Sequence, residues 1–176
     1  RQRTAEVITS LFDKLKSQNQ LYDSLKYVPI DVSDIDFFCK TFSPDISVKL
    51  LALSSLNHNG YVRQRAIEEL AITKHSKAIR FLILRLSDWV KNVREVAASS
   101  IRKYFTDEYR EQFIRELDNI DGLRNVGRVD LTTAHESILS FILEKKLNAE
   151  TYNSLIVADK ARLLYVMKYL EKNSID

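Results

Sequence analysis

The stretch SDWVKNVREVAASSI, residues 87–101, decides the fold that we predict for this chain. A related stretch, LNHNGYVRQRAIEEL, stands 31 residues earlier at 56–70. In both, Val-Arg is followed by Ala three residues after the Arg and by an aliphatic residue four positions further on. Apolar residues three and four apart indicate one face of an amphipathic helix. The repetition therefore predicts two similar helical units in succession.

The composition favours long helices joined by short links. The chain has 176 residues, of which 45% are hydrophobic, but it contains only 3 Gly and 2 Pro. No sustained alternation of apolar and polar residues indicates strands. No apolar run approaches the roughly 20 residues that span a bilayer, so we expect no membrane contact. The sequence does not begin with Met, so we expect it to be a piece of a longer chain.

Apolar periodicity predicts helices along most of the sequence, with short links between them. A shorter helical segment contains Leu21 and Leu25, and another helix opens at Thr133. One further helix holds Phe37, Phe38 and Phe42, and the remaining predicted helices span 4–16, 44–56, 61–72, 77–86, 90–104, 106–117, 150–157 and 158–172.

Several helix ends carry local signals. Ser33 or Asp34 is expected to cap the helix that holds the phenylalanines of 37–42. The turn at 57–60 contains Asn and Gly, which accept the left-handed conformations that a helix end needs. Thr133 and Glu136 match a capping box, in which each side chain satisfies a free backbone amide.

Stacking gives the repeat a physical purpose. A single hairpin of two amphipathic helices cannot cover its own apolar face, whereas a second copy beside it can. Ala66 and Ala97 occupy matching positions, where a small residue lets neighbouring helices approach closely. We therefore expect antiparallel helix hairpins stacked side by side.

A ladder of polar residues is expected to run through this apolar stack. Arg63 and Arg94 each follow an inward-facing valine, so their stems should lie partly inside it. An unpaired buried charge is very costly, and each Arg therefore needs an acceptor. Asn57 and Asp88 stand six residues before the two arginines, at the corners, and can receive the Arg of their own or the adjacent unit.

These residues together resemble a known family. The pattern D-x-x-x-x-V-R-x-x-A-x-x-x-I over 88–101 is similar to the second-helix signature of HEAT repeats. The resemblance implies an all-α fold, a right-handed α-α superhelix (α-solenoid) of stacked antiparallel helix hairpins. In that family an Asp and an Arg form a ladder along the array, and the first helix of each pair lines the convex side. Such a resemblance is nearly silent on function.

The resemblance also suggests how the chain is divided. Residues 1–42 are expected to form an N-terminal helical segment, degenerate or capping, and 43–176 to hold the repeats. The best copies span 44–72 and 77–104, and degenerate copies occupy 106–176. A third copy keeps Asp118 and Arg124 at the expected spacing but has Gly127 in place of the Ala, and 159–162 is a weaker echo. Gly122 and Gly127 weaken any helix across 118–130.

No pattern of an enzyme is evident, so we predict no catalytic, cofactor or metal site and no small-molecule substrate. The three histidines, His58, His75 and His135, lack metal-ligand spacing and are expected at the surface. Cys39 is the single cysteine and is expected to be a small buried hydrophobe. No disulfide within the chain and no signal-peptide pattern make a reducing, cytoplasmic setting the simplest expectation.

Charge distribution suggests where a partner would bind. Residues 57–105 contain ten Lys or Arg against four acids, while the flanks are mildly acidic. We predict a non-catalytic scaffold that binds a protein or peptide, and the basic centre favours an acidic one. The side chains expected to contact this partner are Arg65, Lys91, Arg102 and Lys103.

Two other functions stay open at this point. The same basic side chains could meet successive phosphates of a nucleic acid, with Tyr61 and Tyr104 as stacking surfaces. Some DNA glycosylases for alkylated bases are built from HEAT-like repeats, which would give Asp88 and Trp89 a catalytic setting. We favour the ladder role for Asp88, with Trp89 as a cover over the corner.

Overall fold

A computed structural model describes residues 26–143 together with 164 and 168. All regular structure in this part of the chain is helical, which confirms the all-α class. The helices predicted before residue 26 and at 150–157, and the echo at 159–162, lie outside the described residues, and only residues 164 and 168 of the helix predicted over 158–172 are described. The chain divides into two compact units, Arg1–Tyr104 and Phe105–Asp176. The boundary between the units falls directly after the second of the two best repeat copies, 77–104, whereas the sequence suggested a boundary at residue 42.

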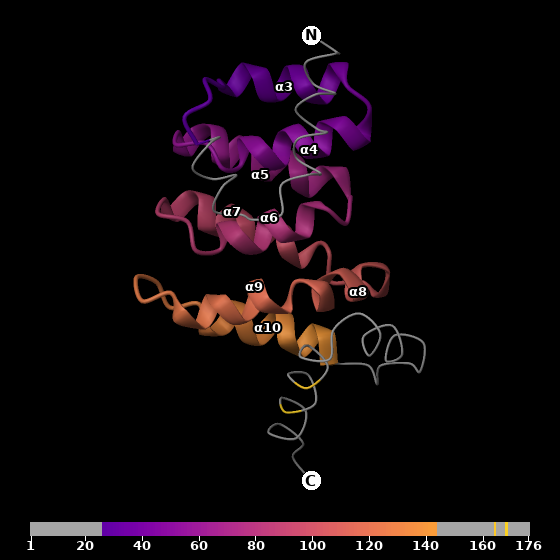
Figure 1. The fold of residues 1–176 in the computed structure, drawn as a ribbon, viewed down its shortest axis with the longest axis vertical. Helices are drawn as coiled ribbons and strands as arrows, with labels where there is room; N and C mark the ends of the chain where they lie inside the picture. The colour runs from indigo at the N-terminus through magenta and orange to yellow at the C-terminus, as the bar shows by residue number, and fades with distance from the viewer. Residues whose placement is uncertain (1–25, 144–163, 165–167, 169–176) are drawn as a thin grey trace. The chain divides into compact units, whose positions relative to one another are not determined.

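Five described helices make up the first unit (Figure 1). Helix α5 packs against all four others, and α7 packs against both α5 and α6. The pairs α4–α5 and α6–α7 are each joined by a short corner, and their second helices lie against one another. The five helices are α3 (Val32–Thr41), α4 (Pro44–Ser54), α5 (Gly60–Thr73), α6 (Ala78–Arg85) and α7 (Lys91–Arg102).

The starts of α3 and α4 follow from local chemistry. Ser43 caps α4 in an extended conformation, and Pro44 then occupies the first turn, where its missing amide costs nothing. The cap of α3 is Asp31, so the prediction of Ser33 or Asp34 is wrong. Asp34 instead lies in the first turn, and its carboxylate accepts a hydrogen bond from the Asp31 amide at 2.8 Å.

The corner at 57–60 uses no left-handed residue, contrary to the prediction. Asn59 is the N-cap of α5, and Gly60 is its first residue. A Cβ atom on Gly60 would lie 3.1 Å from Val90 Cγ2, so the glycine permits a close approach of the next corner. The left-handed residue is Lys74, with φ of 52°, at the C-terminal end of α5.

Small and branched residues fill the contact between α5 and α7. The phenol hydroxyl of the fully buried Tyr104 donates a hydrogen bond to the Leu70 carbonyl of α5 at 2.8 Å. This bond ties the end of the second hairpin to the last turn of α5 in the first. The matching side chains that are buried completely in the two helices are Val62, Ala66, Val93 and Ala97.

The second unit holds three described α-helices and one 3-10 turn, namely α8 (Asp107–Arg115), α9 (Leu117–Gly122), η1 (Leu123–Asn125) and α10 (Thr132–Leu143). The predicted helix 106–117 is interrupted at Glu116, and a short helix occupies part of the span where glycine was expected to weaken one. Arg124 of the third predicted copy lies in the 3-10 turn and in no second helix of a hairpin.

Helix α10 begins one residue before the predicted cap. Thr132 is its first residue, so Thr133 lies inside the helix and the predicted capping box is wrong. The Asp130 carboxylate accepts a hydrogen bond from the Thr132 amide at 2.9 Å. Among the helices described here, none is long and apolar enough to cross a membrane.

Candidate functional site

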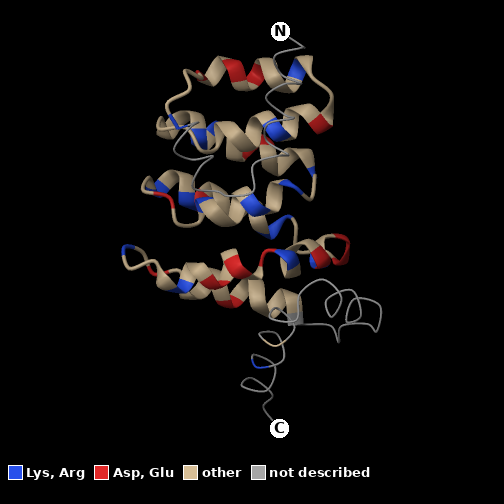
Figure 2. Cartoon of the chain, in the orientation of Figure 1, with Lys and Arg blue, Asp and Glu red and all other residues tan. Residues whose placement is uncertain are grey.

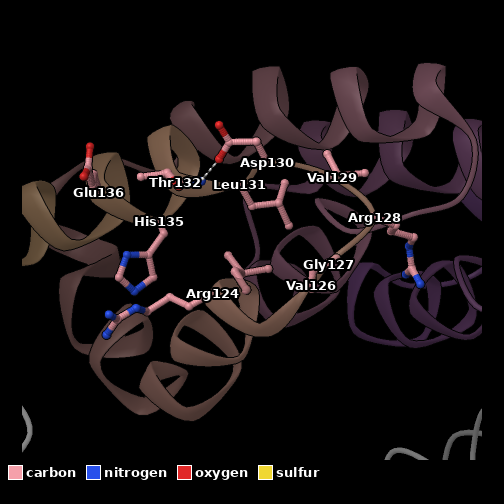
Figure 3. Close-up of a pocket in the computed structure, with 11 residues that line it drawn as sticks. Arg124, Val126, Gly127, Arg128, Val129, Asp130, Leu131, Thr132, His135 and Glu136 are labelled. Atoms are coloured by element: carbon pink, nitrogen blue, oxygen red, sulfur yellow. Dashed lines mark hydrogen bonds between the residues drawn. The ribbon is translucent and has the colours of Figure 1, made fainter.

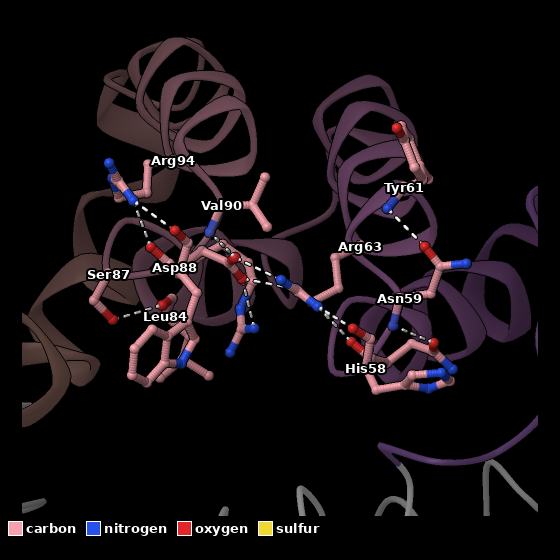
Figure 4. A network of polar contacts seen from close by, with 12 residues as sticks. His58, Asn59, Tyr61, Arg63, Leu84, Ser87, Asp88, Val90 and Arg94 are labelled. Atoms are coloured by element: carbon pink, nitrogen blue, oxygen red, sulfur yellow. Dashed lines mark hydrogen bonds and ion pairs between the residues drawn. The ribbon is translucent and has the colours of Figure 1, made fainter.

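A buried ion pair joins the two corners of the first unit (Figure 4). Arg63, at the start of α5, donates from Nε to Asp88 Oδ2 at 2.8 Å and from Nη2 to Asp88 Oδ1 at 2.7 Å. Arg63 is 7% exposed and Asp88 is 3% exposed. A bidentate pair with this geometry fixes both the distance and the angle between the groups it joins. It therefore sets the position of one hairpin against the next.

The remaining acceptor capacity of Asp88 is also used. Arg85 Nη1 donates to Oδ2 at 3.0 Å, and the Val90 amide donates to Oδ1 at 2.9 Å. Burial alone would raise the pKa of this carboxyl, but the bonds from Arg63 and Val90 and the charge of Arg85 together hold its pKa below the usual value. Asp88 thus stays ionised inside the protein because each of its two carboxylate oxygens accepts two hydrogen bonds.

The two arginines make the same backbone contacts in their own corners. Arg63 Nη1 donates to the carbonyls of Asn57 and His58 at 2.9 and 2.8 Å. Arg94 Nη1 donates to the carbonyls of Asp88 and Trp89 at 2.8 and 3.1 Å. The sequence predicted side-chain acceptors at both corners. The structure places the Asp88 carboxylate on Arg63 of the preceding hairpin, whereas Asn57 offers Arg63 its backbone carbonyl.

Asn57 and Asp88 share one contact and differ in the other. Asn57 Oδ1 accepts from the Asn59 amide at 2.9 Å, as Asp88 Oδ1 does from Val90. Asn57 Nδ2, however, donates to the Val28 carbonyl at 2.7 Å. At the first corner, the Asn57 side chain meets an acceptor, the Val28 carbonyl. At the second corner, the Asp88 side chain meets a donor, the Arg63 guanidinium. An amide fits at the first corner and a carboxylate does not, which explains Asn at this copy of the motif.

This difference leads to a testable prediction for Asn57→Asp. The introduced carboxylate would face the Val28 carbonyl without a proton to donate, so we expect a loss of about 1–3 kcal/mol in the free energy of unfolding. The loss should shrink as pH falls from about 7 to about 4, because burial raises the pKa of the new carboxyl and its protonated form can donate. Urea unfolding at several pH values measures both effects.

Asn92→Asp is the matched control, since Asn92 is an exposed residue of α7. We expect its free energy of unfolding to stay within about 0.5 kcal/mol of the wild type. Equal losses for the two variants, or a loss at Asn57 that does not depend on pH, would contradict the proposed role of the amide.

Arg65 was predicted to contact a partner, but acidic neighbours surround it. Its Nη2 atom lies 2.8 Å from Asp36 Oδ1 of α3 and 2.7 Å from Glu69 Oε1, and its Nη1 atom lies 3.6 Å from Glu68 Oε2. The pair with Asp36 joins α3 to α5 across 29 residues of sequence, whereas the pairs with Glu68 and Glu69 lie within α5. The positive charge of Arg65 is therefore compensated within the protein.

The other predicted contact residues lie on α7. Lys91 forms an exposed ion pair with Glu95, with Nζ 3.6 Å from Oε1. Arg102 and Lys103 are exposed at the C-terminal end of the helix. Asp and Glu outnumber Lys and Arg on α3, whereas Lys and Arg outnumber Asp and Glu over α6 and α7 (Figure 2). Arg65 and Lys91 are nevertheless paired with acids, so the four predicted side chains do not form one uncompensated basic patch.

Exposed aromatic residues lie at or near the two corners. Tyr27, Tyr61 and Trp89 are between 70% and 79% exposed. The Tyr27 ring lies 5.6 Å from that of His58, and His58 and Trp89 occupy equivalent positions of the repeated motif. The prediction that Trp89 covers the corner is wrong, because most of its surface meets solvent. We name these four residues the aromatic edge.

Other predicted side chains differ from expectation. Cys39 is exposed, and its Sγ donates to Glu69 Oε2 at 3.6 Å. Partial burial of the sulfur and the nearby Glu69 carboxylate raise the pKa of this thiol to about 11, which keeps it protonated at neutral pH. Tyr104 is fully buried and offers no stacking surface. His135, expected at the surface, is buried.

The histidines of the first unit have ordinary partners. His58 is exposed, and its Nδ1 lies 3.0 Å from the Lys26 carbonyl. His75 Nε2 lies 3.2 Å from Asp45 Oδ1 at the start of α4. Within residues 26–143, no group of three His, Cys, Asp or Glu side chains is placed to hold a metal ion.

Comparison with protein-family models, with curated proteins and with solved structures finds no match to this chain.

Proposed function

We propose that this chain is a HEAT-like repeat module that binds a protein or peptide and has no catalytic role. The proposal includes a right-handed superhelix in which further hairpins continue the array. It is supported by two packed helix pairs whose second helices touch and by the Arg63–Asp88 bond between their corners. Arrays of this kind present a long surface to which an extended or helical segment can bind.

The aromatic edge is the single observation that carries this function. Exposed Tyr and Trp side chains are the residues most enriched in the energetic centres of protein interfaces. Trp89 follows Asp88 in the second corner, and Tyr61 lies in the first turn of α5 two residues before Arg63. The backbone of both is therefore anchored close to the buried ion pair, although the Tyr61 ring points away from it (Figure 4). Backbone held in this way brings the rings to a partner with little loss of entropy.

The chemistry of the edge also refines the expected partner. Arg65 is compensated by three carboxylates, so an acidic partner gains little from it. We therefore propose a partner segment whose apolar or aromatic side chains contact Tyr61 and Trp89. A nucleic acid receives less support because Tyr104 is buried. A glycosylase would need an accessible carboxylate, whereas both oxygens of Asp88 accept hydrogen bonds inside the protein.

Affinity capture with matched variants tests the proposal. The chain and its Tyr61→Ala/Trp89→Ala variant are used to capture proteins from the native cell extract, and each captured protein is then purified and titrated. We expect the double variant to bind the purified partner at least tenfold more weakly, or about 1.4 kcal/mol. Ile72→Ala is the control, since Ile72 is exposed at the other end of α5 and lies outside the aromatic edge.

Two results would overturn the proposal. One is a partner that binds wild type, the double variant and Ile72→Ala with the same affinity. The other is a gel shift with DNA or RNA that weakens steeply with salt, together with no protein that binds the purified chain. Circular dichroism of each variant checks that its helices are retained. A loss of binding in a folded variant can then be assigned to the missing rings.

A further inference from the structure

The second unit contains a pocket that the proposed protein contact does not use (Figure 3). It has a volume of about 670 Å³ and lies where η1 and the following loop meet the start of α10. This volume is in the range of sites that hold small molecules. No sequence pattern indicated this pocket, because its lining comes from a segment without a recognisable motif.

His135 supplies the first indication of a ligand. It is only 6% exposed, it lines the pocket, and its Nε2 atom is buried without a hydrogen-bond partner among the described residues. Figure 3 shows the imidazole ring turned toward Arg124. Burial, reinforced by the Arg124 charge, lowers the pKa of His135, so the ring is neutral at neutral pH. A buried ring nitrogen without a partner is costly, and a ligand atom at this point would remove the cost.

The charges around the pocket favour an anion. Arg124 and Arg128 both line it, and the start of α10 adds the positive end of a twelve-residue helix. Arg124 is exposed, and its ion pair with Asp121 is long at 3.7 Å. Its guanidinium can therefore turn to a ligand without giving up a strong bond.

Two acidic residues also line the pocket and must be weighed. Asp130 accepts the Thr132 amide, which lowers the pKa of its carboxyl and engages it at the helix start. Glu136 is exposed on α10. A cation would require these carboxylates to converge with His135, but no such group of three exists in the described residues. The arginine beside the imidazole favours the opposite sign.

We propose that this pocket binds the oxyanion group of a small molecule, a phosphate or a carboxylate, between Arg124 and His135. The guanidinium donates two parallel hydrogen bonds to the oxyanion. The neutral imidazole, in the tautomer that carries its proton on Nε2, donates a third. No bond is made or broken in the ligand, so the site is one of binding only.

Titration of the intact chain with inorganic phosphate, and separately with acetate, tests the proposal. The His135 ring resonances are followed by NMR, and heats of binding by calorimetry. We expect saturable binding with a dissociation constant of about 1 mM, as for a small ion held by a few charged bonds. The ion that binds more tightly identifies the ligand group as phosphate or carboxylate.

Matched variants make the test decisive. Arg124→Gln should weaken binding at least tenfold, whereas Arg115→Gln, which removes an exposed arginine paired with Glu111 on α8, should leave it unchanged. His135→Gln keeps a donor in the pocket and should bind more weakly than wild type but measurably. Failure of both ions to saturate the His135 shift, or equal binding by the two arginine variants, would overturn the proposal. Neither result bears on the aromatic edge.

Discussion

Asp88→Ala should lower the free energy of unfolding of the first unit by about 3–5 kcal/mol. The substitution leaves Arg63, 7% exposed, without its carboxylate, and it also removes the acceptor for Arg85 and for the Val90 amide. An uncompensated buried guanidinium is the costly outcome, more than the loss of any one hydrogen bond. Native-state hydrogen exchange of the α5 and α7 amides measures the effect in this unit alone.

Glu95→Ala is the control for this change. Glu95 is also an acid in an ion pair, but it lies exposed on α7 opposite Lys91. We expect its loss to stay below about 0.5 kcal/mol, as is usual for a surface pair. If Asp88→Ala lowered the free energy of unfolding no more than Glu95→Ala does, the Arg63–Asp88 ion pair would not stabilise the first unit.

Ile67→Ala should cost about 2–5 kcal/mol. Ile67 lies on α5, which packs against every other described helix of its unit, and its side chain is 0% exposed. Truncation therefore removes buried apolar surface and leaves a cavity that neighbours on several helices would have to fill. Urea unfolding followed by circular dichroism measures the loss.

Ile72→Ala repeats the same chemical change five positions later on the same helix. Ile72 is 66% exposed, so its truncation should alter the free energy of unfolding by no more than about 0.5 kcal/mol. Comparable losses for the two variants would mean that α5 is not the central helix of the unit.

Much of the first unit could be predicted because its signals are local. The spacing of Val, Arg and Ala indicated both second helices, and the apolar runs indicated both first helices. Arg63 and Arg94 were expected to lie in the stack with acceptors at the corners, and their backbone contacts do lie five and six residues away. Contacts over five or six residues depend only on the local conformation at the start of the helix, so they can be predicted from sequence.

What could not be predicted depends on contacts between distant segments. Arg65 looks free in the sequence, but Asp36 of α3 lies 2.8 Å from it in the structure. Cys39 was expected in the core, yet α3 turns it outward beside Glu69 of α5. His135 lies within a polar stretch of sequence, yet it is buried in a unit where α10 packs against α8, α9 and η1.

A double-mutant cycle between Arg63 and Asp88 tests the central claim most directly, since it asks whether adjacent hairpins are bonded through their corners. The cycle compares Arg63→Met, Asp88→Asn and the double variant by urea unfolding of the whole chain. The structure predicts that the two losses are far from additive, with a coupling energy of about 2 kcal/mol or more. A coupling energy near zero would contradict it, because residues that do not touch lose stability independently.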